Sequence, residues 1–475
     1  MCLSRIAAVI FSALFLAASV CCAAQVKEPA VAGSFYSSDA ATLRSNIDRL
    51  LSSVRPVPGE LLPLAFVVPH AGHIYSGAVA AEVYARLKGR PVSTVILIGP
   101  SHRVPLTGAA IYPGEGMRTP LGTVAINTRA ARALTSDTEH VRMDAAPFAQ
   151  EHSLEVQLPF IQRAQGKNIT IVPILVGSPD QMSFKALTKG IAQILNSDPK
   201  AVLIISTDLS HFHNLETAQT MDNRVIDAME RLSHKDLERL LTSRHGEMCG
   251  GWPVVYGLAA ARSAGATHAV SYRSATSGDV TGDFKSVVGY VSMGIVRGDL
   301  TADQREQLLE LARTAVIRQV KGEKLPDAAT DVPLLKADRA TFVTINEPGG
   351  RLRGCIGSIE PQSSLRASVI SNAVSAASRD TRFTPVRPNE LPGLHYEVTV
   401  LSPLVPLTSV KDIVIGRHGL YLEKDGRSSV FLPQVPVEQG WDRATYLSQL
   451  SLKAGLGADG WKGARLSSFT AEVIK

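Results

Sequence analysis

Residues 64–70 read LAFVVPH, residues 95–102 read VILIGPSH, and residues 202–211 read VLIISTDLSH. These three runs decide the fold, because each predicts a short buried strand and each closes on a histidine. In an open parallel α/β sheet, the side chains just past the carboxyl ends of the strands converge in one crevice. We therefore expect His70, His102 and His211 to be neighbours in space. One histidine after an apolar run is more often a core or turn residue, but three in one domain favour a functional site.

Short apolar runs alternate with helical patterns between residues 27 and 298, which is typical of α/β proteins. The first domain is therefore expected to be one α/β sheet with helices on both faces. Its helices are expected over 39–51, 77–87, 153–164, 184–195 and 254–264, and its further strands over 169–176 and 287–296.

A second unit is expected after a boundary near residues 297–301, since 475 residues exceed one core of about 150 residues. The stretch 301–320 begins with Thr-Ala-Asp-Gln, a good helix start, and is amphipathic. The sequence predicts a smaller α+β domain over 300–475, with a hairpin around Lys424-Asp425-Gly426. Its strands are expected over 340–346, 396–401, 419–423 and 428–432, and its further helices over 363–378 and 444–454.

The N-terminus has the pattern of an export signal: Arg5, an apolar stretch over 6–18, and the small residues Cys22-Ala23-Ala24 for cleavage. Residues 1–24 are therefore predicted to be a signal peptide, and the mature protein to be periplasmic or extracellular, with no membrane anchor. A permanent anchor is the alternative, but the apolar stretch is shorter than the roughly 20 residues that span a bilayer. A lipoprotein acylated at Cys21 or Cys22 is a third interpretation.

Composition excludes two classes of protein. The formal net charge of +6 is spread along the chain without a dense block of lysine or arginine, so no nucleic-acid partner is expected. Of the five cysteines, only Cys249 and Cys355 lie beyond the predicted signal peptide, too few for a disulfide scaffold. We expect these two to be separate thiols in different domains.

Residues that bind metals gather around the predicted strand ends. Imidazole, thiolate and carboxylate together suit a transition metal, and two imidazoles with one anionic ligand leave open positions, as in non-haem iron sites. A structural zinc site would be closed by four ligands, usually in close pairs, and the chain has no CxxC or HExxH pair. The segments that carry these residues are 69–73 (PHAGH), 99–102 (GPSH), 151–155 (EHSLE), 208–211 (DLSH) and 248–251 (MCGG).

The motifs PHAGHIYSG, GPSHR, RTPLG, EHSLEVQLPF, STDLSHF and MCGG, in this order, resemble the Memo family, also called AmmeMemoRadiSam system protein B. The resemblance spans residues 27–298. It implies a LigB-like fold, similar to the class III extradiol dioxygenases, whose iron sits in a site of two histidines and one carboxylate. It also implies that His70, His102 and Cys249 bind a metal, with Asp208 and His211 lining the same pocket.

Cys249 departs from the dioxygenase pattern, because it stands where those enzymes offer a carboxylate. A thiolate shifts preference towards copper or zinc as well as iron, so ring cleavage is not implied, while oxidation at the metal fits the set. His211 is the expected proton donor or acceptor, with Asp208 beside it. His152 is expected as a neighbouring group or further ligand, and His73 as a packing or solvent-facing residue. The simpler interpretations are that Cys249 is a buried hydrophobe and that Asp208 caps a following helix.

The second unit contains LRGCIG at 352–357, followed by SRDTRFTPV and YEVTVLSP. This part resembles the AMMECR family, AmmeMemoRadiSam system protein A, over residues 300–475. Arg353 and Cys355 are a candidate second site, because Cys355 lies between glycines and near the guanidiniums of Arg351 and Arg353, which favour a thiolate. The alternative is a glycine-rich turn with a buried thiol.

Three functions fit the sequence: a metal-dependent oxidoreductase acting on a small or peptidyl substrate, a protein that captures copper or iron without turnover, and an interaction module. The family names imply a radical S-adenosylmethionine partner. The chain lacks a CxxxCxxC motif, so such a partner would be a separate protein. That chemistry is cytoplasmic, which conflicts with the predicted export of this chain.

Overall fold

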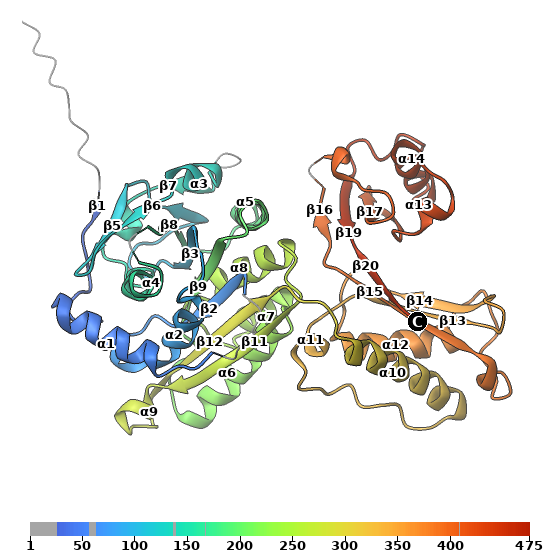
Figure 1. Cartoon of the computed structure of the whole chain (residues 1–475), viewed down its shortest axis with the longest axis horizontal. Helices are drawn as coiled ribbons and strands as arrows, with labels where there is room; N and C mark the ends of the chain where they lie inside the picture. Colours follow the sequence, from blue (N-terminus) through green and yellow to red (C-terminus); the bar gives the residue numbers. More distant parts are fainter. Residues whose placement is uncertain (1–25, 57–62, 136–138, 167, 408) are drawn as a thin grey trace, which may run out of the picture.

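The computed structural model describes residues 26–56, 63–135, 139–166, 168–407 and 409–475, which form two domains (Figure 1). The predicted signal peptide over 1–24, with Cys2, Cys21 and Cys22, lies outside the described residues. Among the described helices, none is both long and apolar enough to cross a membrane.

Parallel strands form the centre of the first domain. They lie in the order β8 (Thr170–Val176), β3 (Thr94–Pro100), β9 (Ala201–Ser206) and β2 (Ala65–Val68). Every residue of these four strands except Thr170 is buried. This explains why their sequences are continuous apolar runs rather than alternating ones. The predicted parallel centre is therefore confirmed.

The edges of this sheet are mixed. On one side β12 (Val287–Val296) pairs antiparallel with β2, and then with β11 (His268–Thr276) and β10 (His211–His213). The other side carries short strands that the sequence did not predict, because runs of three to five residues give weak periodicity. These are β1 (Val26–Lys27), β4 (Ala109–Ile111), β5 (Gly116–Thr119), β6 (Gly122–Ile126) and β7 (Val141–Met143).

Helices cover both faces of the sheet, as predicted. Ile205 and Ser206 are successive residues of β9, so their side chains point to opposite faces of the sheet. Ile205 packs against Gly257 of α8, whereas Ser206 accepts a hydrogen bond from Gln157, just before α4. One group is α1 (Ala40–Ser52), α2 (His73–Leu87) and α4 (Leu158–Gln165); another is α5 (Gln181–Ser197), α7 (His234–Thr242) and α8 (Gly251–Ser263). The remaining helices are α3 (Thr128–Ala133), α6 (Leu215–Glu230) and α9 (Gly278–Thr281), with 3₁₀ turns at Ala146–Phe148 and Glu155–Gln157.

The second domain contains two antiparallel sheets, where the sequence predicted one α+β unit. Helices α10 (Ala302–Lys321) and α12 (Leu365–Ser378) pack on the first sheet. This sheet has the order β14 (Leu352–Gly357), β13 (Thr341–Asn346), β15 (His395–Leu401) and β20 (Ala471–Ile474). The second has the order β16 (Val405–Pro406), β19 (Arg465–Phe469), β17 (Gly419–Lys424) and β18 (Arg427–Phe431), with α13 (Val435–Glu438) and α14 (Arg443–Lys453).

Two local predictions for this domain are confirmed. The hairpin between β17 and β18 turns at Asp425 and Gly426, whose φ angles of 51° and 73° are those of a tight two-residue hairpin turn. Thr301 and Gln304 form a reciprocal capping box at the start of α10.

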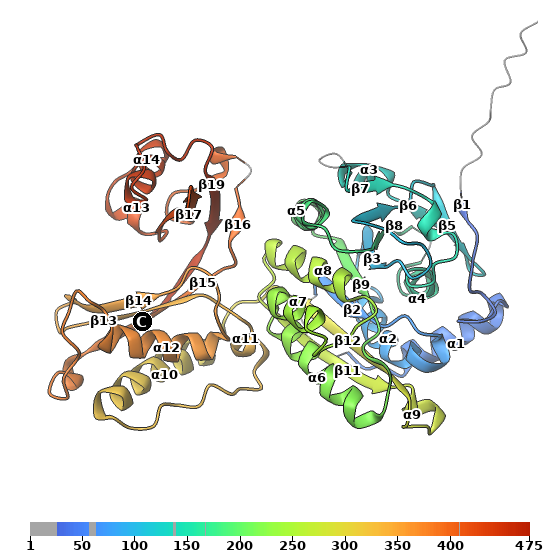
Figure 2. The same ribbon diagram turned by 180° about the vertical axis from the view of Figure 1, so that it is seen from behind.

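The chain passes from the first domain to the second between the end of β12 at Val296 and the start of α10 at Ala302. Ion pairs hold them together beside the short helix α11 (Pro333–Lys336), seen between the domains in Figure 2. Arg231 donates to Asp338 at 3.2 Å, and Lys336 pairs with Glu230 at 2.6 Å.

A buried carboxylate fixes the N-terminal segment of the first domain. Glu155, which has no exposed surface, accepts hydrogen bonds from Ala30 N, Val31 N, Tyr36 Oη and Lys27 Nζ. Lys27 is itself buried, so this ion pair is enclosed. Since β1 pairs with β5, the carboxylate anchors the edge of the sheet from within.

Replacing Glu155 with Gln should destabilise the first domain by about 3 kcal/mol, because a buried lysine charge would lose its partner. Urea unfolding of the full chain measures this. Glu28→Gln is the matched control, since Glu28 is exposed and pairs with Arg118 at the surface, and its loss should cost under about 0.5 kcal/mol. Equal effects of the two substitutions would contradict the structural role of Glu155.

Candidate metal centre

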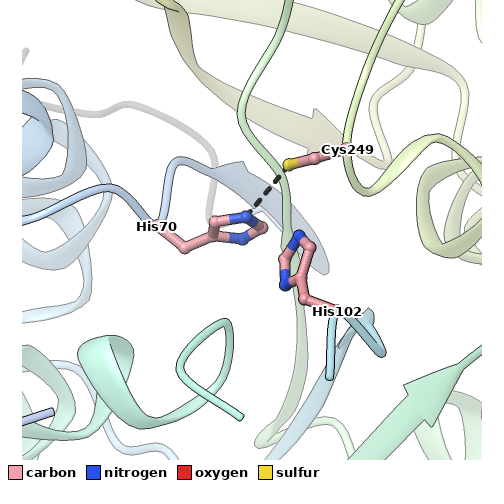
Figure 3. Close-up of side chains that lie close together, drawn as sticks. All are labelled: His70, His102 and Cys249. Atoms are coloured by element: carbon pink, nitrogen blue, oxygen red, sulfur yellow. Dashed lines mark hydrogen bonds between the residues drawn. The ribbon is translucent and has the colours of Figure 1, made fainter. Parts of the chain in front are cut away.

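Three side chains from separate elements meet beyond the carboxyl ends of the central strands (Figure 3). His70 lies two residues after β2, His102 two residues after β3, and Cys249 two residues before α8. One potential ligand atom from each lies within 4.8 Å of those from the other two. The structure thus brings together the three residues that the resemblance implied as metal ligands.

The ring orientation of His70 is set by a chain of hydrogen bonds. The Ser206 hydroxyl donates to the carbonyl oxygen of Ser153 at 2.6 Å, so it accepts from His70 Nδ1 at 3.0 Å. His70 Nε2 therefore carries the lone pair, and it faces Cys249 Sγ at 3.0 Å. Burial and the neighbouring histidines lower the pKa of His70, which keeps the ring neutral and able to bind a metal.

Glu151 holds His102 in the same way. This buried carboxylate accepts from His102 Nδ1 at 2.9 Å and from the backbone nitrogens of His102, His152 and Ser153. Burial opposes the charge, but the hydrogen bonds from His102 and the backbone outweigh it and lower the pKa of Glu151 to about 2. Because Nδ1 is engaged, Nε2 is the nitrogen of His102 left for a metal, an arrangement common among histidine ligands. The His102 side chain is 26% exposed, so the site is open on this side.

Cys249 is placed by the backbone. Its Sγ accepts from Asp208 N at 3.2 Å, and the next residue must be glycine because a Cβ atom at Gly250 would lie 2.5 Å from the carbonyl oxygen of Ser206. Burial and then the charge of Asp208 raise the pKa of the Cys249 thiol. In the absence of a metal the S–H group therefore donates to His70 Nε2, and a bound cation would replace that proton.

Asp208 and His211 lie beside Cys249 and form a second group with ligand atoms within 4.8 Å of one another. Asp208 does not cap a following helix, as the simpler interpretation held, because α6 begins at Leu215 with Asn214 as its cap. Its Oδ1 instead accepts from the backbone nitrogens of His70 and Ala71, and burial raises the pKa of Asp208 to about 7. His211 Nε2 is buried without a hydrogen-bond partner among the described residues.

His152 completes the pocket, and His73 stands apart from it. The His152 ring stacks on that of His102 with centroids 4.7 Å apart, and its Nδ1 lies 3.2 Å from Glu151 without the alignment of a hydrogen bond. His73 Nε2 lies 2.9 Å from the carbonyl oxygen of Val156, and the ring packs against Phe160, so His73 is a packing residue.

Sequence reasoning placed Glu151 in a candidate metal-binding segment but missed that Glu151, Ser206 and Gln157 orient the histidines. The Gln157 amide donates to Ser206 Oγ and to the carbonyl oxygen of Pro69, next to His70. Their positions carry a signal: Glu151 and Gln157 lie in the EHSLEVQLPF motif, and Ser206 ends the strand that leads to Asp208. Polar residues at such fixed points among apolar neighbours indicate buried hydrogen-bond partners.

The candidate site of the second domain differs from the prediction. Cys355 lies within strand β14, so the glycine-rich turn is wrong; Gly354 is required because a Cβ atom there would lie 2.2 Å from the carbonyl oxygen of Ala376. Both predicted guanidiniums are engaged by glutamates, Arg353 by Glu390 at 2.7 Å and Arg351 by Glu347 at 2.8 Å, so neither is left to stabilise a thiolate.

Other groups surround Cys355 instead. Thr344 Oγ1 donates to Cys355 Sγ at 3.2 Å, Asp380 accepts from Cys355 N, and Arg382 donates to the carbonyl oxygen of Cys355. A functional role of Arg353 and Cys355 stays a prediction.

Comparison with known proteins identifies a family for each of the two domains. The sequence profile of the family described as Memo-like protein matches residues 27–294, and that of AMMECR1 matches residues 309–474. A MEMO1 family protein of Aquifex aeolicus is 36% identical over 269 residues, which are 57% of this chain and 98% of the relative. A MEMO1 family protein of Sulfolobus acidocaldarius is 37% identical over 281 residues, with 56% and 98% of the two chains covered.

Among solved structures, an uncharacterized protein of Pyrococcus horikoshii matches with 36% identity and a TM-score of 0.35. The match covers 37% of this chain and 92% of that one.

Replacing Glu151 with Gln should weaken zinc binding to the full chain by about 10- to 100-fold, because the ring of His102 would lose the carboxylate that fixes its orientation. Competition against a chromophoric chelator measures the affinity. Glu28→Gln, which changes an exposed carboxylate of the same domain, should leave it unchanged. A Glu151→Gln protein that folds normally and binds zinc with unchanged affinity would show that Glu151 has no positioning role.

Proposed function

This chain belongs to the Memo family and carries an AMMECR1 domain after it, and from that premise we propose that it is a metal-binding protein with iron or copper as its metal and with oxidoreductase activity. The metal would be held by His70, His102 and Cys249. The observation that carries the proposal is that the two imidazoles are oriented through their Nδ1 atoms, so that both Nε2 atoms are available beside one sulfur.

The donors fit a transition metal. Both histidines offer neutral nitrogens, and the site also offers one thiol whose proton a cation displaces. His70, His102 and Cys249 are three ligands, one fewer than the four protein ligands that close a structural zinc site. Soft sulfur with imidazole suits copper, and two histidines with one anion also suit iron; zinc would bind the same set.

The residues around the three ligands supply what oxidation of a substrate needs. A bound iron or copper ion would contribute one-electron chemistry at its open positions. The partly exposed side at His102 gives a substrate access. His211, whose buried Nε2 has no partner among the described residues, would accept or donate a proton. Asp208, with a pKa raised to about 7 by burial, would do the same near neutral pH.

Metal capture without turnover is a second candidate, and one observation favours it. The ligand groups overlap: Cys249 belongs to the group with Asp208 and His211 as well, and His102 to a group with Glu151 and His152. A pocket with spare ligands can saturate the coordination of a captured ion and leave no position for a substrate.

Full-length protein stripped of metal and reloaded separately with iron(II), copper(I) and zinc should hold about one equivalent, because the donor set forms one site. His70→Ala and Cys249→Ser should each remove most of the bound metal, as measured by elemental analysis. Cys355→Ser is the matched control for loss of a thiol and should keep the parent's content. Metal content that is unchanged in Cys249→Ser, or absent from the parent, would overturn the proposal.

Oxygen uptake by the iron- and copper-loaded proteins separates the two candidates. Uptake that is lost in His70→Ala supports the oxidoreductase. Copper(I) that stays bound in air without oxygen uptake supports metal capture.

A further inference from the structure

A polar cavity lies between the two domains, away from the metal centre. Its volume is about 250 Å³, and both domains line it. The first domain contributes one end each of α7 and α8 and a face of α5, which lie on the side that faces α11 (Figure 2). The second contributes residues next to β13, β14 and β15. The polar and charged lining residues are Thr188, Ser233, His234, Lys235, Arg262, Ser263, Asp338 and Glu360.

Two polar atoms in this lining are buried and unsatisfied. Thr188 Oγ1 and His234 Nδ1 make no hydrogen bond with any described residue. Buried polar atoms in native proteins nearly always have a hydrogen-bond partner, because a buried donor or acceptor without one costs about 1–3 kcal/mol. Both residues line the cavity, Thr188 from α5 and His234 from α7, so these two atoms are unused hydrogen-bonding groups beside it.

The charge at the cavity comes from Arg262 at the end of α8. Its guanidinium makes one hydrogen bond, from Nη1 to the carbonyl oxygen of Leu232, and no ion pair within the described part of the chain. Arg339 of the second domain lies close enough for repulsion between the two guanidiniums, and burial and then Arg262 lower the pKa of Arg339 to about 10. Burial, then Arg262 and Lys235, likewise lower the pKa of His234 to about 4, as a positive potential requires.

The acidic residues of the lining already have partners. Asp338 accepts from Arg231 at 3.2 Å, and Glu360 pairs with Lys235 at 3.2 Å. Glu360 neutralises Lys235, whereas Asp338 shares Arg231 with Asp227 and Asp236. Both acids also attract Arg262 over a longer distance. Neither Arg262 nor Arg339 forms an ion pair with a described residue, since their guanidiniums donate to the carbonyl oxygens of Leu232 and Leu401. A guanidinium with free N–H groups, a hydroxyl and an imidazole are the groups that bind an oxyanion.

We propose that the cavity between the domains binds a small oxyanion, the phosphate or carboxylate group of a metabolite, with Arg262 as its charged partner and Thr188 and His234 as its hydrogen-bond partners. The proposal does not depend on a metal at His70, His102 and Cys249. Because residues from both domains line the cavity, an anion bound there would also strengthen the contact between the domains.

Titration calorimetry of the metal-free full chain tests the proposal, with sodium phosphate and sodium malonate as separate probes and sodium chloride keeping the ionic strength constant. We expect saturable binding of at least one probe. Phosphate alone would identify a phosphate site, and malonate alone a carboxylate site. Arg262→Met should weaken this binding at least tenfold, and Thr188→Val, which keeps the size of the side chain, about three- to tenfold.

Arg44→Met is the matched control, since Arg44 is exposed on α1, and it should bind like the parent. If Arg262→Met does not fold, Thr188→Val carries the comparison alone. The proposal is wrong if neither probe binds saturably, or if binding is unchanged in the cavity variants that fold.

Discussion

The parallel alignment of β2, β3 and β9 is the constraint on which the candidate metal centre depends. It brings the carboxyl ends of the three strands to one edge of the sheet, so that His70, His102 and the segment 206–211 emerge side by side. Cys249 reaches the same edge because α8 starts against the end of β9, where Gly250 permits contact with the backbone of Ser206. Ligands that are distant in sequence thereby acquire fixed relative positions before any metal binds, which lowers the cost of ordering them.

The sequence predicts those parts of the structure that come from long apolar runs or long periodic segments. The buried central strands and the amphipathic helices were predictable, because runs of six or seven apolar residues and 3.6-residue periodicity are strong patterns. The short edge strands were not, and neither were β16 and β19, which pair beside the predicted hairpin to complete the second sheet of the AMMECR1 part. The ligands His70, His102 and Cys249 were predictable as residues from the family resemblance. Their orientation by Ser206 and Glu151 was not, since hydrogen-bond partners 49 and 136 residues apart leave no local pattern.

At Cys355 the sequence suggested contacts that the structure does not contain. The nearby arginines in the sequence suggested an activated thiol, but Glu347 and Glu390 pair with those guanidiniums instead. Nearness in sequence is a poor guide to charge contacts in a strand. The groups around the sulfur and backbone of Cys355 come from residues 344, 380 and 382 instead.

The central claim, a metal held by two histidines and one cysteine, is tested most directly by X-ray absorption spectroscopy of the zinc-loaded full chain, with zinc as the probe. The account predicts one sulfur neighbour at about 2.3 Å and two imidazole nitrogens at about 2.0–2.1 Å, with the sulfur lost in Cys249→Ser and kept in Cys355→Ser. A shell of nitrogen and oxygen neighbours alone in the parent protein would contradict it.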